Sequence, residues 1–241
     1  MRLETVYDTL VISDVHLGSP LAMARELTNL LNQIYLGVIK VKRIILLGDI
    51  FSDLNFSRLT SEHWQVISLI RELSNPKREI EVVWVEGNHD AGVTEVMEHL
   101  LGVPVYQQYT WGWNGNTCVA MHGHQFDALF ANGNPWFNDF VTGLHIWLQK
   151  RNLLKRWLPT ILDKLHTKYQ RLTFKVADGA ISVAKGLKAD YVFCGHTHSP
   201  YHEYRDGVEY WNAGCWVGDV ASYLILDENV KLVNIVRATE T

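Results

Sequence analysis

Short apolar runs that end in polar residues recur along this sequence. The four apolar residues 44–47 predict a strand buried on both faces, and Gly48 and Asp49 follow where such a strand must end. The design is repeated at residues 9–13, which lead into Asp14-Val15-His16, and at residues 81–85, which lead into Glu86-Gly87-Asn88-His89-Asp90. The pattern predicts three strands, each with acidic, amide or histidine side chains at its carboxyl end.

Apolar residues at helical spacing separate these strands. One helix is predicted within residues 20–35, and a second has its inner face at Val66, Ile67, Ile70 and Leu73. We expect Ser61 to cap the second helix and Asn75-Pro76 to end it. Strands that alternate with helices imply an α/β fold with a mostly parallel sheet, whose functional edge lies at the carboxyl ends of its strands. All three polar clusters fall on that edge.

From Val105 the pattern changes to hairpins, with strands at residues 109–113 and 116–121 around an Asn114-Gly115 turn. His122-Gly123-His124 follows the second strand. Residues 127–188 carry no strand pattern and predict a helical insertion, a candidate lid, within a single domain of 241 residues. A strand at 191–194 then leads into Gly195-His196-Thr197-His198, and the last predicted strands are antiparallel, at residues 201–204, 208–212, 221–226 and 230–236.

Composition excludes several classes of protein. No apolar run reaches the roughly 18 residues of a membrane span, and Arg2, Glu4 and Asp8 occupy the place of a secretory signal, so we expect a cytoplasmic protein. Three cysteines without a Cys-x-x-Cys spacing indicate neither a disulfide framework nor a thiolate zinc site. The net charge of −4 argues against a nucleic-acid partner, although basic residues gather between positions 150 and 175. No obligate protein partner is indicated.

The polar strand ends together offer a set of oxygen and imidazole ligands. On an extended stretch residues i and i+2 share a face, so Asp14 and His16 are expected to hold one cation together. The absence of thiolates favours Mn first, with Fe, Zn, Co or Ni as alternatives. One ion would be crowded by the whole set, whereas two ions that share Asp49 would use every ligand and leave room for a bridging hydroxide. The set is Asp14, His16, Asp49, Asn88, His122, His196 and His198.

The five motifs, taken in order, resemble those of the calcineurin-like metallophosphoesterase superfamily. They are Asp-x-His, Gly-Asp, Gly-Asn-His-Asp, His-Gly-His and Gly-His-x-His, and they span residues 14 to 198. The resemblance implies a four-layer α/β/β/α fold, a dinuclear metal centre and hydrolysis of phosphoesters. It assigns one ion to Asp14, His16, Asp49 and His198, and the other to Asp49, Asn88, His122 and His196.

The resemblance also gives roles to residues outside the ligand set. His89 matches the histidine that contacts the phosphoryl group and helps the leaving oxygen, with Asp90 orienting it. His124 lies two residues after His122 in a stretch expected to be extended, so it either faces the substrate or packs against the body.

One branch of the superfamily, the UDP-2,3-diacylglucosamine diphosphatases of lipid A biosynthesis, is most similar in its Ser-Asp-Val-His-Leu-Gly opening, its His-Gly-x-x-Phe-Asp motif at 122–127 and its helical insertion. This implies pyrophosphate cleavage of a lipid sugar nucleotide. Apolar insertion residues such as Trp147 and Trp157 would then bind acyl chains or meet the inner membrane, or else pack against the body.

The chain departs from that branch at two positions, with His89 in place of arginine and His124 in place of aspartate. A general phosphomonoesterase or phosphodiesterase acting on nucleotides or other small phosphates is therefore the alternative. A third hypothesis, a scaffold that binds partners without catalysis, is disfavoured because such scaffolds usually lose metal ligands and this chain retains the whole set.

Overall fold

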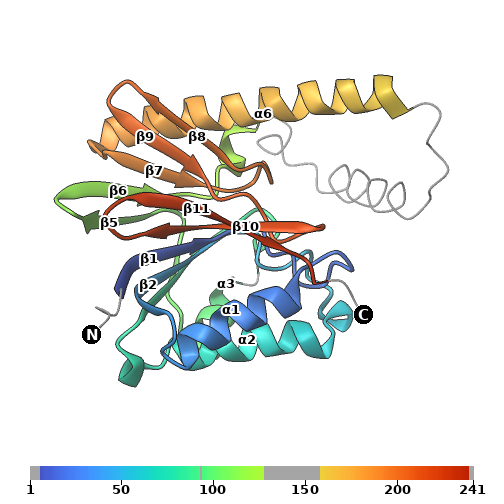
Figure 1. Ribbon diagram of the computed structural model, residues 1–241, viewed down its shortest axis with the longest axis vertical. Coiled ribbons are helices and arrows are strands. Elements are labelled where there is room, and N and C mark those ends of the chain that lie inside the picture. The colour runs from blue at the N-terminus through green and yellow to red at the C-terminus, as the bar shows by residue number, and fades with distance from the viewer. Residues whose placement is uncertain (1–5, 93, 128–157, 239–241) are drawn as a thin grey trace.

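Two β-sheets lie face to face, and helices cover their outer faces (Figure 1). The computed structural model describes residues 6–92, 94–127 and 158–238. The first sheet has the order β11-β10-β1-β2-β3-β4 and the second the order β5-β6-β7-β9-β8. The strands of the first sheet are β1 Val6–Ile12, β2 Lys40–Leu47, β3 Glu81–Val85, β4 Val105–Tyr106, β10 Val220–Leu226 and β11 Val230–Val236. Those of the second are β5 Tyr109–Trp113, β6 Asn116–Ala120, β7 Tyr191–Cys194, β8 Tyr201–Arg205 and β9 Val208–Asn212.

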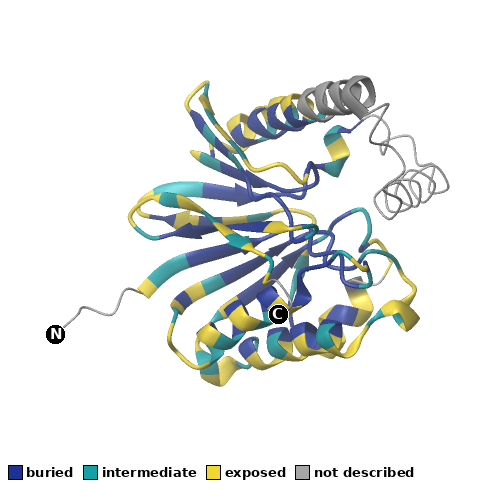
Figure 2. Cartoon of the chain, turned by 45° about the vertical axis from the view of Figure 1, so that its right-hand side comes forward, coloured by how far each residue is buried: buried dark blue, intermediate teal, exposed yellow. Residues whose placement is uncertain are grey.

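The helices complete a four-layer α/β/β/α arrangement, which confirms the predicted fold class. One outer layer contains α1 (Ala24–Tyr35) and α2 (Ser61–Leu73), with α3 (Thr94–Leu101) beside them, and the other contains α6 (Leu158–Leu187) (Figure 1). Burial follows these layers, because the strands are largely buried and the helices expose only their outward faces (Figure 2). Each interface between layers therefore contains a hydrophobic core of its own.

Strand β2 shows why the sequence folds in this way. Its apolar residues Ile44, Ile45, Leu46 and Leu47 are all buried, with Ile44 and Leu46 packed toward α1 and α2 and Ile45 and Leu47 toward the second sheet. Burying each of these side chains contributes about 1.5–3 kcal/mol to stability. Because both faces are covered, the strand is a continuous apolar run instead of an alternating one.

The predicted parallel core is confirmed, since β1 pairs with β2 and β2 with β3 in parallel. The hairpin predicted around Asn114-Gly115 is confirmed by the antiparallel pair of β5 and β6. Val105–Tyr106, where the hairpin pattern was expected to begin, instead form β4, which pairs in parallel with β3, and Trp84 N donates to Pro104 O beside this pair. The predicted cap of the second helix was also off by one residue. Thr60 is the N-cap and shares a capping box with His63, so Ser61 is the first helical residue.

The last four strands do form antiparallel hairpins, but the two hairpins belong to different sheets. The β8–β9 hairpin extends the second sheet through a parallel pairing of β9 with β7, and the β10–β11 hairpin extends the first sheet beside β1. Within the predicted insertion at 127–188, Leu158–Leu187 form α6 along the outer face of the second sheet. Residues 128–157, which include Trp147 and Trp157, lie outside the described range.

Candidate metal centre

Loops at the carboxyl ends of strands from both sheets meet at one place and are joined by hydrogen bonds. Asp14 N donates to Gly48 O over 3.1 Å, which ties the loop after β1 to the loop after β2. His196 N donates to Asp14 Oδ2 over 2.9 Å and ties the loop after β7, in the second sheet, to the first. Polar residues that are far apart in the sequence are thereby collected at one edge of the sandwich.

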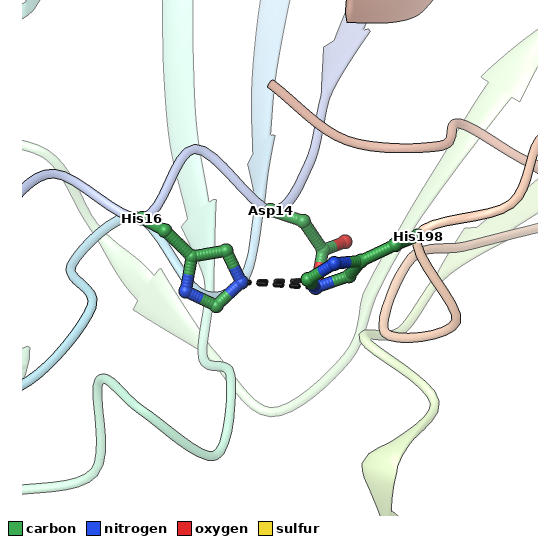
Figure 3. Close-up of side chains that lie close together, drawn as sticks. All are labelled: Asp14, His16 and His198. Carbon is green, nitrogen blue, oxygen red and sulfur yellow. Dashed lines mark hydrogen bonds and ion pairs between the residues drawn. The ribbon is translucent and has the colours of Figure 1, made fainter. Parts of the chain in front are cut away.

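Asp14, His16 and His198 point toward a common centre (Figure 3). The Nε2 atoms of the two histidines are 3.0 Å apart, and Asp14 Oδ1 lies 3.2 Å from His198 Nε2 and 3.8 Å from His16 Nε2. Ligand atoms that share one ion, with bonds of about 2.1 Å, are roughly 3.0–3.4 Å apart. Two of the three distances fall in this range, and the distance from Asp14 Oδ1 to His16 Nε2, 3.8 Å, is somewhat longer, so the three side chains need only a small adjustment to serve as ligands of a single cation.

Asp49 lies between this group and a second one. Its Oδ2 atom is 3.9 Å from His16 Nε2 and 3.2 Å from His122 Nε2, and Asp49, His122 and His196 form a further cluster with ligand atoms close together. His122 is fixed by its other nitrogen, which donates to Leu47 O over 3.0 Å. The carboxylate of Asp49 therefore lies between the two groups of candidate ligands.

The backbone of these loops is unusual. Five candidate ligands have positive φ angles, a region that residues with a Cβ rarely adopt and that costs of order 1–3 kcal/mol at each position. They are Asp14 (52°), His16 (51°), Asp49 (52°), His196 (67°) and His198 (54°). The extended backbone expected for residues 14–16 was therefore wrong. The two side chains converge because the chain turns sharply at each of them.

Two glycines allow the loops to approach this closely. A Cβ on Gly48 would lie 2.3 Å from Nδ1 of His122, and a Cβ on Gly87 would lie 2.2 Å from Asp49 N and 2.3 Å from Asp49 Oδ1. Real Cβ atoms essentially never come within 3.0 Å of such atoms. Any larger residue at either position would displace a candidate ligand.

Several buried atoms at the centre fit a bound cation. Asp14 Oδ1, Asn88 Oδ1 and His122 Nε2 make no hydrogen bond of good geometry with any part of the chain that the structure describes. A buried polar atom left in this way costs about 1–3 kcal/mol. All three atoms belong to the predicted ligand set, so an oxygen- and nitrogen-binding divalent ion would supply the partners that they lack.

The buried carboxylates of Asp14 and Asp49 also need positive charge nearby. Burial acts to raise the pKa of Asp14, but His122 and His198 together outweigh it and hold that pKa well below its usual range. For His122, burial acts in the opposite direction, and the nearby Asp49 and Asp14 outweigh it and raise its pKa to about 10. Two buried carboxylates thus hold a proton on a histidine, in a place where a divalent ion would neutralise them more fully.

Comparison with known sequences agrees with this geometry. The sequence model of the calcineurin-like phosphoesterase family matches residues 7–200, a range that includes every candidate ligand. The chain belongs to this family. Membership of the calcineurin-like phosphoesterases indicates metal-dependent hydrolysis of phosphoesters, and the clusters of His and Asp side chains are suited to divalent ions.

Solved structures and curated proteins were compared as well. An archaeal phosphodiesterase shares 16% identity over 94% of this chain and 99% of its own, with a TM-score of 0.48. Vps29 from Chaetomium thermophilum shares 12% identity over 95% of this chain and 98% of its own, with a TM-score of 0.49. No curated protein matches the chain. The family assignment rests on the sequence match.

His89 lies at the margin of the ligand set in this calcineurin-like phosphoesterase. Its backbone N–H donates to Asp49 Oδ1 over 2.8 Å, and its ring Nε2 is 3.9 Å from Asp49 Oδ2. Ring nitrogen Nδ1 is 2.7 Å from Ser52 O, and because a carbonyl only accepts, Nδ1 must carry the proton. The ring therefore presents Nε2 to the site.

Asp90 does not orient His89 in the way that the resemblance implied. The Ser52 carbonyl holds the ring, while the buried Asp90 carboxylate accepts hydrogen bonds from one side chain and three backbone amides: Trp84 Nε1, Gly87 N, Ile50 N and Phe51 N. Asp90 instead fastens the loop that follows Asp49 to the loop that carries Asn88. No sequence pattern could have identified Ser52, because its backbone makes the contact.

His124 lies beside the second cluster. Its ring centroid is 5.5 Å from that of His122 and 6.4 Å from that of His196, and its Nδ1 is buried without a hydrogen bond to any described residue. The pKa of His124 is lowered to about 4, mainly because the ring is buried and to a smaller extent because of the charge of His122. The stretch is not extended as predicted, because Gly123 has a φ of 106° and a short 3-10 helix, η3 (His124–Phe126), begins directly after it.

Proposed function

We propose that this chain hydrolyses phosphoester or diphosphate bonds with two divalent metal ions, Mn first among them, held in two groups that share Asp49. The observation that carries this proposal is the position of Asp49 Oδ2 between His16 and His122, each of which belongs to a different ligand cluster. Asn88 completes the second group, since its buried Oδ1 atom lacks a hydrogen bond among the described residues. When bound, the ions polarise the phosphoryl group and generate the nucleophile from water at neutral pH.

The chain's own residues contribute position and proton transfer. With Nδ1 committed to Ser52 O, His89 is left with Nε2, which when protonated would donate a hydrogen bond to a phosphoryl oxygen or a proton to the leaving oxygen. Asp90 holds the loop of Asp49 and the loop of Asn88 in fixed positions relative to each other through its four hydrogen bonds. Asp90 therefore acts on catalysis through the positions of Asp49, Asn88 and His89.

For the substrate, we propose a lipid sugar nucleotide of the UDP-diacylglucosamine type. Support comes from the His-Gly-x-x-Phe-Asp motif at 122–127 and from the basic, apolar composition of the segment between β6 and β7. His124 would contact the substrate beside the second ion, and Trp147 and Trp157, which precede α6 in the sequence, would bind acyl chains in a lid or at the surface of the inner membrane. The substitution of His for Arg at position 89 favours a small phosphate ester as the alternative substrate.

Turnover of three substrates by the Mn-loaded protein distinguishes these options. The substrates are a lipid sugar pyrophosphate, a nucleotide diester and an aryl phosphate. If acyl chains are bound, each buried methylene contributes about 0.8 kcal/mol, so removal of four carbons should lower kcat/KM for the lipid by about two orders of magnitude. Turnover of the aryl phosphate and the diester alone would refute the lipid proposal and favour the small-phosphate alternative.

Two tryptophan variants test the proposed lid. Trp147→Ala and Trp157→Ala should lower kcat/KM for the lipid and spare the aryl phosphate, because only the lipid reaches the lid. Trp64→Ala, on the half-exposed face of α2, is the matched control and should spare both substrates. Parallel loss of both activities with a lower Tm would mean that the tryptophans pack the segment instead of binding substrate.

A further inference from the structure

The last residue of the His-Gly-x-x-Phe-Asp motif has no role in the proposed reaction, yet Asp127 is buried beside a candidate ligand. It follows η3 directly, only 4% of its surface is exposed, and its Oδ2 atom is 3.6 Å from His196 Nε2. Burying a carboxylate is costly unless it has a cationic or hydrogen-bonding partner. Its position therefore requires an explanation.

An imidazole that binds a metal ion uses one ring nitrogen and commonly donates a hydrogen bond from the other. The group facing the second nitrogen fixes the orientation of the ring and sets how basic the ligand is. In His122 that group is the carbonyl of Leu47, which is neutral. In His196 the Nε2 atom lies 3.6 Å from the Asp127 carboxylate, an ion-pair distance longer than a hydrogen bond, so we assign Nδ1 to the ion.

Helix α6, on the outer face of the second sheet, sets the position of Asp127 through the neighbouring residue Phe126. The ring of Phe126 occupies the space above Gly179 of α6, where an added Cβ would lie 2.2 Å from Phe126 Cδ1. Two hydrogen bonds hold the turn that carries Phe126 and Asp127. Phe126 N donates to Gly123 O and Asp127 N donates to His124 O, both over 3.1 Å. The contact between Phe126 and Gly179 thus fixes the position from which Asp127 reaches His196.

We propose that Asp127 is a positioning residue for the second metal ion, that it acts by holding and polarising His196, and that the packing of Phe126 on Gly179 sets its position. This inference rests on the proposed two-ion site. The ion bound by Asp49, His122 and His196 then depends on Asp127, whereas the ion bound by Asp14, His16 and His198 does not. Each part of the motif then has a role: His122 is a ligand, Gly123 begins the turn, Phe126 packs on α6 and Asp127 positions His196.

Stepwise Mn²⁺ binding to the full-length protein, measured by calorimetry without substrate, tests the proposal. Loss of an outer contact to a ligand typically weakens metal binding 10–100-fold. Asp127→Asn should weaken one of the two binding steps by that factor and leave the other within twofold. His122→Ala identifies the affected step, because it removes a ligand of the same ion. Asp178→Asn, an exposed aspartate on α6, is the matched control and should change neither step.

A second variant tests the anchor from a distance. Gly179→Ala should displace Phe126 and weaken the same step as Asp127→Asn, whereas Gly186→Ala, on the same helix with no atom near the added Cβ, should not. The proposal is overturned if both steps weaken equally with a lower Tm of the metal-free protein, or if neither step changes in the Asp127 variant. A loss greater than about 1,000-fold would make Asp127 a direct ligand. If the unaltered protein binds fewer than two ions, the proposed function fails and this inference fails with it.

Discussion

Gly87 offers a stringent test of the site's geometry, because alanine at this position adds a single methyl group directly against Asp49. The added Cβ would lie 2.2 Å from Asp49 N, while real contacts of this kind begin near 3.0 Å, so one of the two loops must move by about 0.8 Å. The nearest atom is backbone, which cannot rotate away. Asp90 also holds both loops through Gly87 N, Ile50 N and Phe51 N, so the shift cannot be absorbed at one end.

A misplacement of about 1 Å in a catalytic group costs on the order of 100-fold in rate. Overpacking of a tightly packed site costs about 1–3 kcal/mol in stability. We therefore expect Gly87→Ala to lower kcat/KM for an aryl phosphate about 100-fold and to weaken both Mn²⁺ binding steps, because Asp49 serves both ions. Gly112→Ala is the matched control: it has no atom near the added Cβ and should retain full activity.

The prediction is tested by measuring kcat/KM, the Mn²⁺ affinities by calorimetry and the Tm of Gly87→Ala and Gly112→Ala. If Gly87→Ala keeps kcat/KM within twofold of the unaltered protein while remaining folded, the contact between residue 87 and Asp49 does not constrain the site and the reasoning is refuted.

The remaining predictions concern single roles within the same centre. His89→Ala should retain both ions and lose about 100-fold in turnover of a poor leaving group, since one positioned proton donor is removed; an unchanged rate with that substrate would exclude His89 from the reaction. Asp90→Ala leaves four buried N–H donors without their acceptor, so it should lower the free energy of unfolding by several kcal/mol in urea titrations; a loss below about 1 kcal/mol would contradict the fastening role. Adding Mn²⁺ at about 100 times its Kd should stabilise the protein by about 2.7 kcal/mol for each ion, and an unchanged Tm would contradict binding to the folded state.

Much of the fold was predictable because its strands carry unmistakable local signals. The apolar run of β2 and the glycine and acid that follow it locate both a strand and its functional end, and the alternation with α1 and α2 implies a parallel sheet. The division of the two C-terminal hairpins between sheets was not predictable. A hairpin pattern specifies only its own two strands, and the pairing of β9 with β7 is decided by packing between distant parts of the chain.

The candidate ligands were predictable from residue type and order, but their supports were not. Ser52 acts through its backbone carbonyl, which any residue has, so it leaves no distinctive residue pattern. Asp90 was given the wrong contact, because sequence adjacency to His89 suggested a partner that the fold places elsewhere. The left-handed backbone of Asp14 and Asp49 was equally hidden, since only the tertiary structure stabilises it.

The claim that two ions share Asp49 is tested most directly by counting bound metal. Elemental analysis of the Mn-loaded protein after removal of free metal should give two ions per chain, and Asp49→Asn should give fewer than one, because the amide offers only one neutral oxygen to two cations. If Asp49→Asn retains two ions per chain and near-normal turnover, Asp49 does not bridge them and the account of the centre is wrong.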